Sequence, residues 1–421
     1  MRYYYQNIWA TAKDLKAGEV EVYNENFFKS LDDVELQWTL ESEGKVLANG
    51  RNALDIPAQQ KRVVKLDGYS LPADVKGEVV LNLDFVLKKA EPMLDAGYAV
   101  AREQFVVNPY TFPTMESVLA VTSGKYDTRK VEKEEKVAWV TLSAGNTSVT
   151  FNHWNGWIDY LDVDGKPMLE EGYAITPDFW RAPTDNDNGN NTAERLRIWK
   201  TASQEFHPTV RVSQQGTQTV VAVNYILSAG NHYTLTYTLS DDGRLHVAAD
   251  YTPASKADTP ELPRVGLRFR LPAAMDGVTY FGRGPEENYI DRNHGTPIGR
   301  YQAKANDLYY PYVRPQENGH HTDVRWLRLE DHLGNGLLIK ADSVMEFNAL
   351  RNSIEDFDQG KATNHHADEI HPRHFVEVCL DGCMQGVGGY DSWGSRPAPQ
   401  HQLPADRAYH FGFSIQPVVR S

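Results

Sequence analysis

The alternation of apolar and polar residues constrains the fold of this chain more than any other feature. Residues 34–40 alternate perfectly, and the odd positions of residues 79–87 are all apolar. A period of two is typical of a half-buried β-strand, because successive side chains point to opposite faces of a sheet. The pattern resumes at residues 98–100 and is broken by the proline-containing segment NPYTFPT (108–114). Residues 1–108 are therefore predicted to form an antiparallel sandwich of immunoglobulin size.

The alternation continues after this break. Residues 233–239 alternate between large apolar residues and threonine, and Asp-Asp-Gly at 241–243 supplies a turn into the next strand pattern. Residues 265–271 form another half-buried pattern, with arginines on the second face. A convincing helix is expected only from residue 192 to residue 199. The sequence thus predicts an all-β protein in which residues 115–421 form one large two-sheet sandwich.

Length, charge and cysteine content limit the possible classes of partner. A chain of 421 residues is too long for one ordinary core and agrees with two or three domains. Its net charge of −14 would repel a phosphate backbone, so nucleic acid is not an expected partner. No run approaches the roughly eighteen apolar residues of a membrane span, so no membrane partner is expected. Cys379 and Cys383 would lie about 13 Å apart in an extended segment, so two free thiols are expected.

The segment FWRAPTDNDNGNN (179–191) is the most polar loop predicted in the chain. Asp185 and Asp187 suggest a calcium loop, but the glycine, Gly189, falls one position too early. Two interpretations remain. One is a turn rich in hydrogen bonds from Asn and Asp side chains, and the other is a mobile loop at the edge of a binding site that includes Asn186.

A second candidate site is the segment VGGYDSWGS (387–395). Sugars stack their C–H faces on aromatic rings while amides and carboxylates bind their hydroxyl groups, so an aromatic residue beside Asp is typical of a carbohydrate site. Most of the nine tryptophans are expected in the core. Trp393 is the exception, because its glycine and small polar neighbours cannot bury it. Trp393 and Asp391 are therefore predicted to bind substrate.

Histidines gather in NHHADEIHPRH (364–374), where four imidazoles and two carboxyl groups would offer ligands to a metal. The spacing matches no specific metal motif, so an exposed polar loop is the favoured interpretation.

The stretch GRGPEENYIDRNHGTPIGRY (282–301) allows three interpretations. A phosphate loop is disfavoured, because Pro285 has no N–H to donate and two carboxylates follow it. Glu286 and Glu287 are sequence neighbours, and on an extended chain they point to opposite faces, so they are not a catalytic pair. A structural role remains.

Within that stretch, GRGPEENYIDR is similar to the G-x-G-P-x-E-N-Y-x-D-R segment of glycoside hydrolase family two β-galactosidases, the LacZ-like enzymes. Three further segments resemble that family in the same order: FWRAPTDNDNG (179–189), PYVRPQENG (311–319) and the MQGVGGYDSW run that ends at Trp393. Near the start of the chain, YQNIWA and EVYNENFF resemble the start of the immunoglobulin-like domain that precedes the C-terminal domain of these enzymes. The resemblance covers essentially the whole chain.

The resemblance implies an immunoglobulin-like β-sandwich followed by a galactose-mutarotase-like β-supersandwich. It implies that the two catalytic glutamates and the magnesium and sodium ligands lie on a missing TIM barrel and the domains before it, so this chain is expected to hold no catalytic residue, metal or cofactor. Trp393 would form part of the active-site wall, and residues 185–189 would lie beside the active-site mouth. Asp291 and Arg292 would hold neighbouring loops. The parent would be a homo-oligomer that hydrolyses terminal β-galactosides.

Two properties of the parent stay open. Arg283, Glu286 and His294 depart from the best-known members of the family, so the aglycone preference is not implied. The opening MRYYYQNIWA shows no secretory signal and is typical of a cut inside a larger protein, which leaves the bacterial cytoplasm and the periplasm as alternatives.

Two other functions compete with this one. The first is a free-standing carbohydrate-binding module of the same fold. The second is a mutarotase-like sugar epimerase, which needs a histidine and a glutamate facing one sugar ring. Glu286, Glu287 and Glu317 are available for that role, but no histidine stands out.

Overall fold

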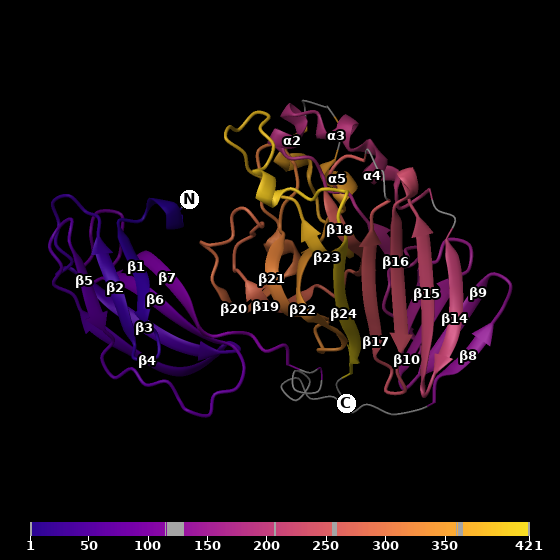
Figure 1. Ribbon diagram of the computed structural model, residues 1–421, viewed down its shortest axis with the longest axis horizontal. Coiled ribbons are helices and arrows are strands. Elements are labelled where there is room, and N and C mark those ends of the chain that lie inside the picture. The colour runs from indigo at the N-terminus through magenta and orange to yellow at the C-terminus, as the bar shows by residue number, and fades with distance from the viewer. Residues whose placement is uncertain are drawn as a thin grey trace. The chain divides into compact units, whose positions relative to one another are not determined.

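The computed structural model describes residues 2–113, 115, 130–205, 208–254, 259–358, 360 and 365–419. The chain divides into two compact units, Met1–Pro113 with Pro297–Arg300, and Thr114–Thr296 with Tyr301–Ser421. Strands dominate both units and the helices are short (Figure 1). The predicted all-β class is confirmed.

The first unit is a sandwich of two antiparallel sheets. One sheet has the order β1 (Ile8–Asp14), β2 (Glu19–Asn24), β5 (Lys61–Lys65), and the other the order β4 (Lys45–Ala53), β3 (Val34–Ser42), β6 (Val79–Leu87), β7 (Ala99–Asn108). Val20 and Val22 from the first sheet share a core with Leu36, Leu83 and Phe85 from the second. This arrangement agrees with the immunoglobulin-like sandwich expected from the sequence.

The second unit contains a small and a large sheet. The small sheet has the order β12 (Lys166–Pro167), β11 (Ile158–Val163), β10 (Thr147–Asn152), β9 (Trp139–Ala144), β8 (Glu132–Glu135). The large sheet has the order β13 (Thr176–Asp178), β18 (Arg264–Pro272), β23 (Phe375–Met384), β22 (Gly336–Leu350), β24 (Tyr409–Val418), β17 (Leu245–Thr252), β16 (His232–Leu239), β15 (Gln218–Ile226), β14 (Thr209–Gln215). Its remaining strands are β19 (Gly277–Arg283), β20 (Ile298–Lys304) and β21 (His321–Glu330), with β21 joining β19 to β22.

The two sheets of the second unit pack face to face over one core. Phe151 on β10 and Tyr237 on β16 are fully buried, and their ring centroids lie 5.0 Å apart. The predicted alternation explains this packing, because every second residue of β16 is buried. Leu239 pairs with Leu245 across the predicted Asp-Asp-Gly turn. The two-sheet sandwich is confirmed.

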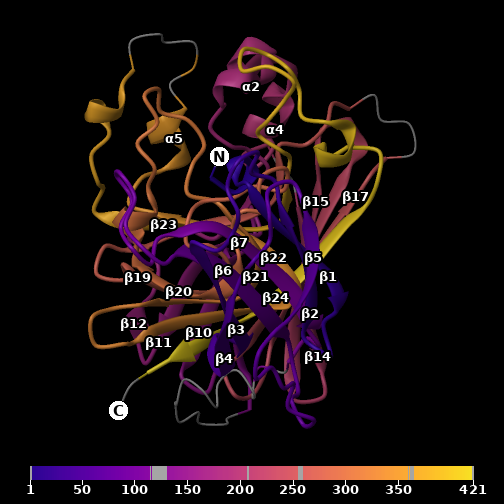
Figure 2. The ribbon, with the colours of Figure 1, turned by 90° about the vertical axis from the view of Figure 1, so that its left-hand side faces the viewer.

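The helices of the second unit are α2 (Asp185–Gly189), α3 (Thr192–Arg195), α4 (Arg197–Thr201) and α5 (Ile354–Phe357). They gather at one end of the large sheet, and the segment that follows β23 passes beside α2 in both views (Figures 1 and 2). Single-turn 3₁₀ segments occur at Arg2–Tyr5, Ser228–Gly230, Ala305–Leu308, Ala367–Glu369 and Pro399–His401. Across the described ranges, no helix combines the length and apolar character needed to cross a membrane.

The predicted helix from Thr192 to Trp199 is interrupted. Leu196, with φ −106° and ψ 14°, ends α3 and precedes α4. Leu196 and Trp199 are both buried, so tertiary packing sets the path of the backbone here.

Candidate functional site

The segment predicted as a loop at the active-site mouth forms the helix α2 instead. Thr184 is its N-cap and accepts a hydrogen bond from the Asp187 amide at 3.1 Å, while the Asp187 carboxylate accepts one from the Thr184 amide at 3.0 Å. This reciprocal capping box satisfies two amides that a helix end leaves unpaired. Asp185 is exposed, whereas Asn186 and Asp187 are buried. The expectation of a loop was therefore wrong for residues 185–189.

A buried ion pair fixes the start of this segment. Arg181 and Asp187, with side chains 1% and 3% exposed, form two parallel hydrogen bonds of 3.0 Å. Arg181 also donates to the carbonyl oxygens of Gln385 at 2.5 Å and Gly386 at 3.0 Å. A buried guanidinium is stable only when its charge and its donors are matched, and these four bonds achieve that.

Further contacts bring α2 against the segment that carries Trp393. The Asn186 side chain donates to the carbonyl oxygen of Asp391 at 3.0 Å. A Cβ atom added at Gly189 would lie 1.9 Å from the carbonyl oxygen of Trp393, so only glycine allows this approach. The two predicted site segments, about two hundred residues apart in the sequence, are therefore neighbours in the fold.

Trp393 is exposed, as predicted from its small neighbours. Its side chain is 76% exposed and that of Tyr390 is 95% exposed. The Asp391 carboxylate shapes the turn between them, because one of its oxygens accepts the amides of Trp393, Gly394 and Ser395 at 2.9–3.0 Å. The hydrogen bond from the Ser395 amide is the main reason that the pKa of Asp391 is lowered. Tyr390 was missed by sequence reasoning, although it shares the small neighbours that marked Trp393.

Residues of the GRGPEENYIDR stretch serve as structural supports. Glu287 accepts hydrogen bonds from Arg292 at 2.6 Å, from the Gly319 amide at 2.6 Å and from the Tyr312 hydroxyl. Asp291 accepts the Gly388 amide at 2.7 Å and so holds the loop before Trp393. The structural interpretation of this stretch, with Asp291 and Arg292 holding loops, is confirmed.

A buried polar centre, made of Arg264, His320, Glu346, Asn348 and Asp381, lies inside the second unit. Arg264 binds the Asp381 carboxylate at 2.7 and 3.1 Å and donates to Asn348 Oδ1 at 2.8 Å. His320 Nδ1 lies 2.7 Å from the same Oδ1, and Nε2 lies 2.8 Å from Glu346 Oε2. Sequence reasoning missed this set, because its members come from four separate strands and loops.

Burial controls the protonation of this centre. Burial, together with the charge of Asp323, raises the pKa of Glu346 to about 8. Burial likewise raises the pKa of Asp381 to about 7 against the opposing charge of Arg264. The pKa of His320 is lowered, chiefly by burial. The buried polar centre therefore favours a neutral histidine beside a protonated glutamate at neutral pH.

The orientation of Asn348 supports this assignment. Its amide nitrogen donates to Glu317 Oε1 at 2.8 Å and to the Asn318 carbonyl at 3.0 Å, so its Oδ1 faces His320 as an acceptor. His320 Nδ1 must then carry the proton, which leaves Nε2 to accept from the Glu346 carboxyl. A cavity beside Asn348 has a volume of about 20 Å³, enough for about one water molecule and far too small for a sugar ring.

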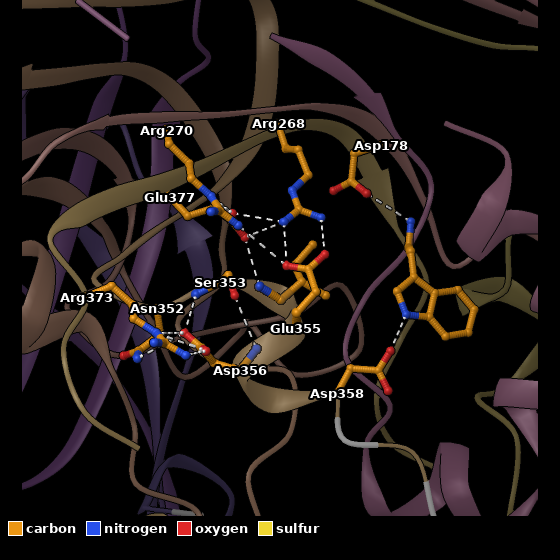
Figure 3. A network of polar contacts seen from close by, with 12 residues as sticks. Asp178, Arg268, Arg270, Asn352, Ser353, Glu355, Asp356, Asp358, Arg373 and Glu377 are labelled. Carbon is orange, nitrogen blue, oxygen red and sulfur yellow. Dashed lines mark hydrogen bonds and ion pairs between the residues drawn. The ribbon is translucent and has the colours of Figure 1, made fainter. Parts of the chain in front are cut away.

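A second polar network holds α5 against the large sheet (Figure 3). Arg268 forms two bonds to Glu355 at 2.7 and 2.8 Å and two to Glu377 at 2.9 and 3.1 Å, and Arg270 adds one to Glu377 at 2.8 Å. Burial alone would raise the pKa of Glu355, but the bonds and charge of Arg268 lower it to about 2. The arginines expected on the second face of strand 265–271 therefore serve as helix anchors.

The segment before Arg181 is tied to the same region. The Trp180 indole donates to Asp358 at 2.8 Å, and its carbonyl accepts from Arg264 at 3.2 Å. Lys200 also binds Asp358, at 2.6 Å. The buried polar centre and the α5 network thus both support the chain that leads into α2.

The histidine segment does not converge on a metal. His365 is buried and bonded to Glu369 at 2.6 Å and to the Asp356 carbonyl at 3.1 Å, while His366, His371 and His374 are exposed. Asn364 of this segment lies outside the described residues. In the ranges that the structure describes, no group of three or more His, Cys, Asp or Glu side chains could hold a metal ion. Both cysteines are free thiols, as predicted.

Comparison with known proteins agrees with these observations. A family model described as β-galactosidase small chain matches residues 143–415, and one described as β-galactosidase domain 4 matches residues 20–108. A β-galactosidase from Priestia megaterium is 32% identical over 98% of this chain and 39% of its own length. A β-galactosidase from Streptococcus thermophilus is 25% identical over 99% of this chain and 39% of its own length.

A solved galactose 1-epimerase from Lactobacillus acidophilus covers 70% of this chain and all of its own, with a TM-score of 0.41 and 11% identity, too distant a likeness to bear on function. The chain spans about two fifths of the length of the curated β-galactosidases. The family model for the small chain accounts for well over half of the sequence. The chain therefore belongs to the β-galactosidase small-chain family.

Proposed function

We propose that this chain is the C-terminal, non-barrel portion of a β-galactosidase that hydrolyses terminal β-galactosides. In this proposal the chain supports the active site and lines part of it, and Trp393 contacts the sugar. Asp391 contributes to the same wall. The observation that carries the proposal is the exposure of Trp393 on a turn that is bonded to the rest of the second unit.

An exposed tryptophan is costly for a monomeric domain. Leaving such a ring in water forgoes roughly 1.5–3 kcal/mol of burial, on the scale of other large apolar side chains. Trp393 is nevertheless held in a turn shaped by Asp391. An exposed ring on a turn whose backbone is held in place is suited to stacking on the C–H face of a sugar.

The proposal assigns the catalytic glutamates, magnesium and sodium to the remaining three fifths of the parent. Glu287 is engaged by Arg292 and Gly319, which supports the view that it is not catalytic here.

The epimerase alternative has no specific observation in its favour. An epimerase needs a sugar between a histidine and a glutamate, and the cavity of about 20 Å³ beside the buried polar centre is too small for a sugar ring. A free-standing carbohydrate-binding module would also use Trp393, so the geometry of this residue does not distinguish that alternative from the proposal. Galactoside kinetics in the full-length enzyme distinguish the two.

The decisive experiment measures the kinetics of Trp393→Ala in the full-length enzyme. Loss of one stacking contact is expected to raise KM for a chromogenic galactoside about three- to tenfold. Trp154→Ala is the matched control, because Trp154 is also exposed, at 72%, but lies on the small sheet's β10–β11 turn. If both variants behave like the wild type, Trp393 does not contact substrate and the proposal fails.

A further inference from the structure

The loop of residues 385–395 carries Trp393 and is ordered from within only around Asp391, whose carboxylate accepts three amides of the loop. Glycine occupies positions 386, 388, 389 and 394, and glycine loses more backbone freedom on folding than any other residue. Tyr390 and Trp393 are exposed, so burial of their rings does not hold the loop. Its position must therefore depend on contacts from outside.

Contacts from other elements reach this loop at points spread along it. At its start, the Gln385 amide donates to the Pro263 carbonyl and the Gly386 amide donates to the His401 carbonyl. Further contacts, in chain order, are Arg181 to the Gln385 and Gly386 carbonyls, Asp291 to the Gly388 amide, Asn186 to the Asp391 carbonyl, and Gly189 against the Trp393 carbonyl. The contacts at Asp391 and Trp393 both come from the short helix α2, which follows Arg181 in the chain.

Arg181 and α2 form one anchor because they share the carboxylate of Asp187. That carboxylate accepts two bonds from Arg181 and one from the Thr184 amide, so it serves the ion pair and the helix cap together. Asp187 and Arg181 are both buried, and each would be strongly destabilising without the other. The helix and the arginine thus keep each other in place.

A continuous series of hydrogen bonds runs from this anchor to Trp393. Asn186 holds the carbonyl of Asp391, and the Asp391 carboxylate in turn holds the amide of Trp393 at 3.0 Å. The Asn186 side chain is only 8% exposed, so water competes little for its amide group.

We propose that Arg181 and Asn186 are positioning residues for Trp393. They fix the loop so that the exposed indole is presented to sugar in one orientation, without touching the sugar themselves. This inference rests on the proposed role of Trp393 and extends it to residues that come from a distant part of the chain. Asn186 is the better residue to test, since removing Arg181 would leave the buried Asp187 without its partner.

The first experiment is a double-mutant cycle in the full-length enzyme with Asn186→Ala and Trp393→Ala. Asn186→Ala is expected to raise KM for a chromogenic galactoside about threefold, the loss expected for one hydrogen bond, with kcat nearly unchanged. The double variant is expected to match Trp393→Ala alone, because positioning has no effect once the ring is gone. A KM increase that multiplies with that of Trp393→Ala would overturn the inference.

The matched control is Asn188→Ala, from the same helix. Asn188 is half-buried, and its side chain makes no hydrogen bond with the loop of residues 385–395, all of which the structure describes. The Asn188→Ala enzyme is expected to keep the wild-type KM. Equal KM values for Asn186→Ala and Asn188→Ala would also overturn the inference.

Hydrogen exchange separates failure of this inference from failure of the proposed function. In Asn186→Ala, peptides from residues 385–395 of the full-length enzyme are expected to exchange faster than in Asn188→Ala. If Trp393→Ala leaves KM unchanged while this exchange difference is present, the proposed sugar contact is wrong and the positioning of the loop stands. If the exchange is equal in both variants, Asn186 does not position Trp393.

Discussion

Asn348 determines how protons are arranged around it in the buried polar centre. Its Oδ1 receives hydrogen bonds from Arg264 and His320, and its amide nitrogen is committed to Glu317 and Asn318. A flipped amide would place donors against donors, so the assignment is fixed by the network. His320 Nε2 is then an acceptor, and the protonated Glu346 carboxyl is its donor.

The raised pKa of Glu346 predicts a pH dependence of stability. The folded state keeps the Glu346 proton up to about pH 8, whereas an unfolded glutamate releases it near pH 4.5. The stabilisation is therefore complete below about pH 4.5 and is lost as pH rises through 8. Over this window the free energy of unfolding is expected to fall by up to about 1.4 kcal/mol per pH unit from this group.

Glu346→Gln tests this dependence, because the amide keeps the size of the side chain and still donates to His320 but does not titrate. The free energy of unfolding of the wild type and of the variant is measured by urea unfolding between pH 5 and pH 8. It is expected to fall less steeply with pH in the variant. Asp381, whose pKa is raised to about 7, titrates in both proteins and accounts for slope that remains. A variant slope equal to that of the wild type would contradict the assignment of the Glu346 proton.

At the scale of single elements, α2 shows how tertiary contacts create a helix that sequence periodicity does not signal. Five residues are too few to display a helical period, and asparagine and aspartate favour turns over helix interiors. The helix forms because Thr184 and Asp187 cap it, and because Arg181 neutralises the buried Asp187 carboxylate. The long strands were predictable for the opposite reason, since β3 and β16 each display their buried face in their own residues.

The candidate site likewise has features that the sequence could predict and features that it could not. Exposure of Trp393 followed from its immediate neighbours, so the sequence could predict it. The hydrogen bonds that Asn186 and Arg181 donate to the loop of residues 385–395 join residues more than two hundred positions apart, and no local pattern indicates them. The buried polar centre was missed because burial of an ionisable residue depends on partners, such as Arg264 for Asp381, from other strands.

The capping of α2 can be tested with Thr184→Ala. The variant loses the acceptor for the Asp187 amide and is expected to be about 1 kcal/mol less stable, which corresponds to a fall of about 1–2 °C in the midpoint of thermal unfolding. Thr184→Ser keeps the hydroxyl, and its free energy of unfolding is expected to lie within about 0.5 kcal/mol of the wild-type value. Equal destabilisation by both substitutions would show that the methyl group of Thr184, and not its hydroxyl, stabilises the helix.

At the scale of the whole molecule, the chain combines an all-β framework with a turn that exposes two aromatic rings. Its polar groups are largely engaged with one another, as in the two networks that support α2, whereas Tyr390 and Trp393 remain exposed. Under the proposed function, this chain contributes the shape and one wall of the site, and the reacting groups come from the remaining length of the parent. That separation has a direct consequence for the isolated chain.

The isolated 421-residue chain is expected to hydrolyse no galactoside. A retaining glycosidase needs two carboxyl groups about 5–5.5 Å apart, and an inverting one needs them about 6.5–9.5 Å apart, both facing the substrate. Glu287 is committed to Arg292 and Gly319, and Glu346 is buried against His320, so neither faces solvent as a free catalytic group. The measurement is turnover of a chromogenic galactoside by the purified chain, with the full-length enzyme as the positive control. Turnover that survives repurification and is abolished by Glu286→Gln, Glu287→Gln or Glu317→Gln would place the catalytic groups within this chain and refute the proposed division of labour.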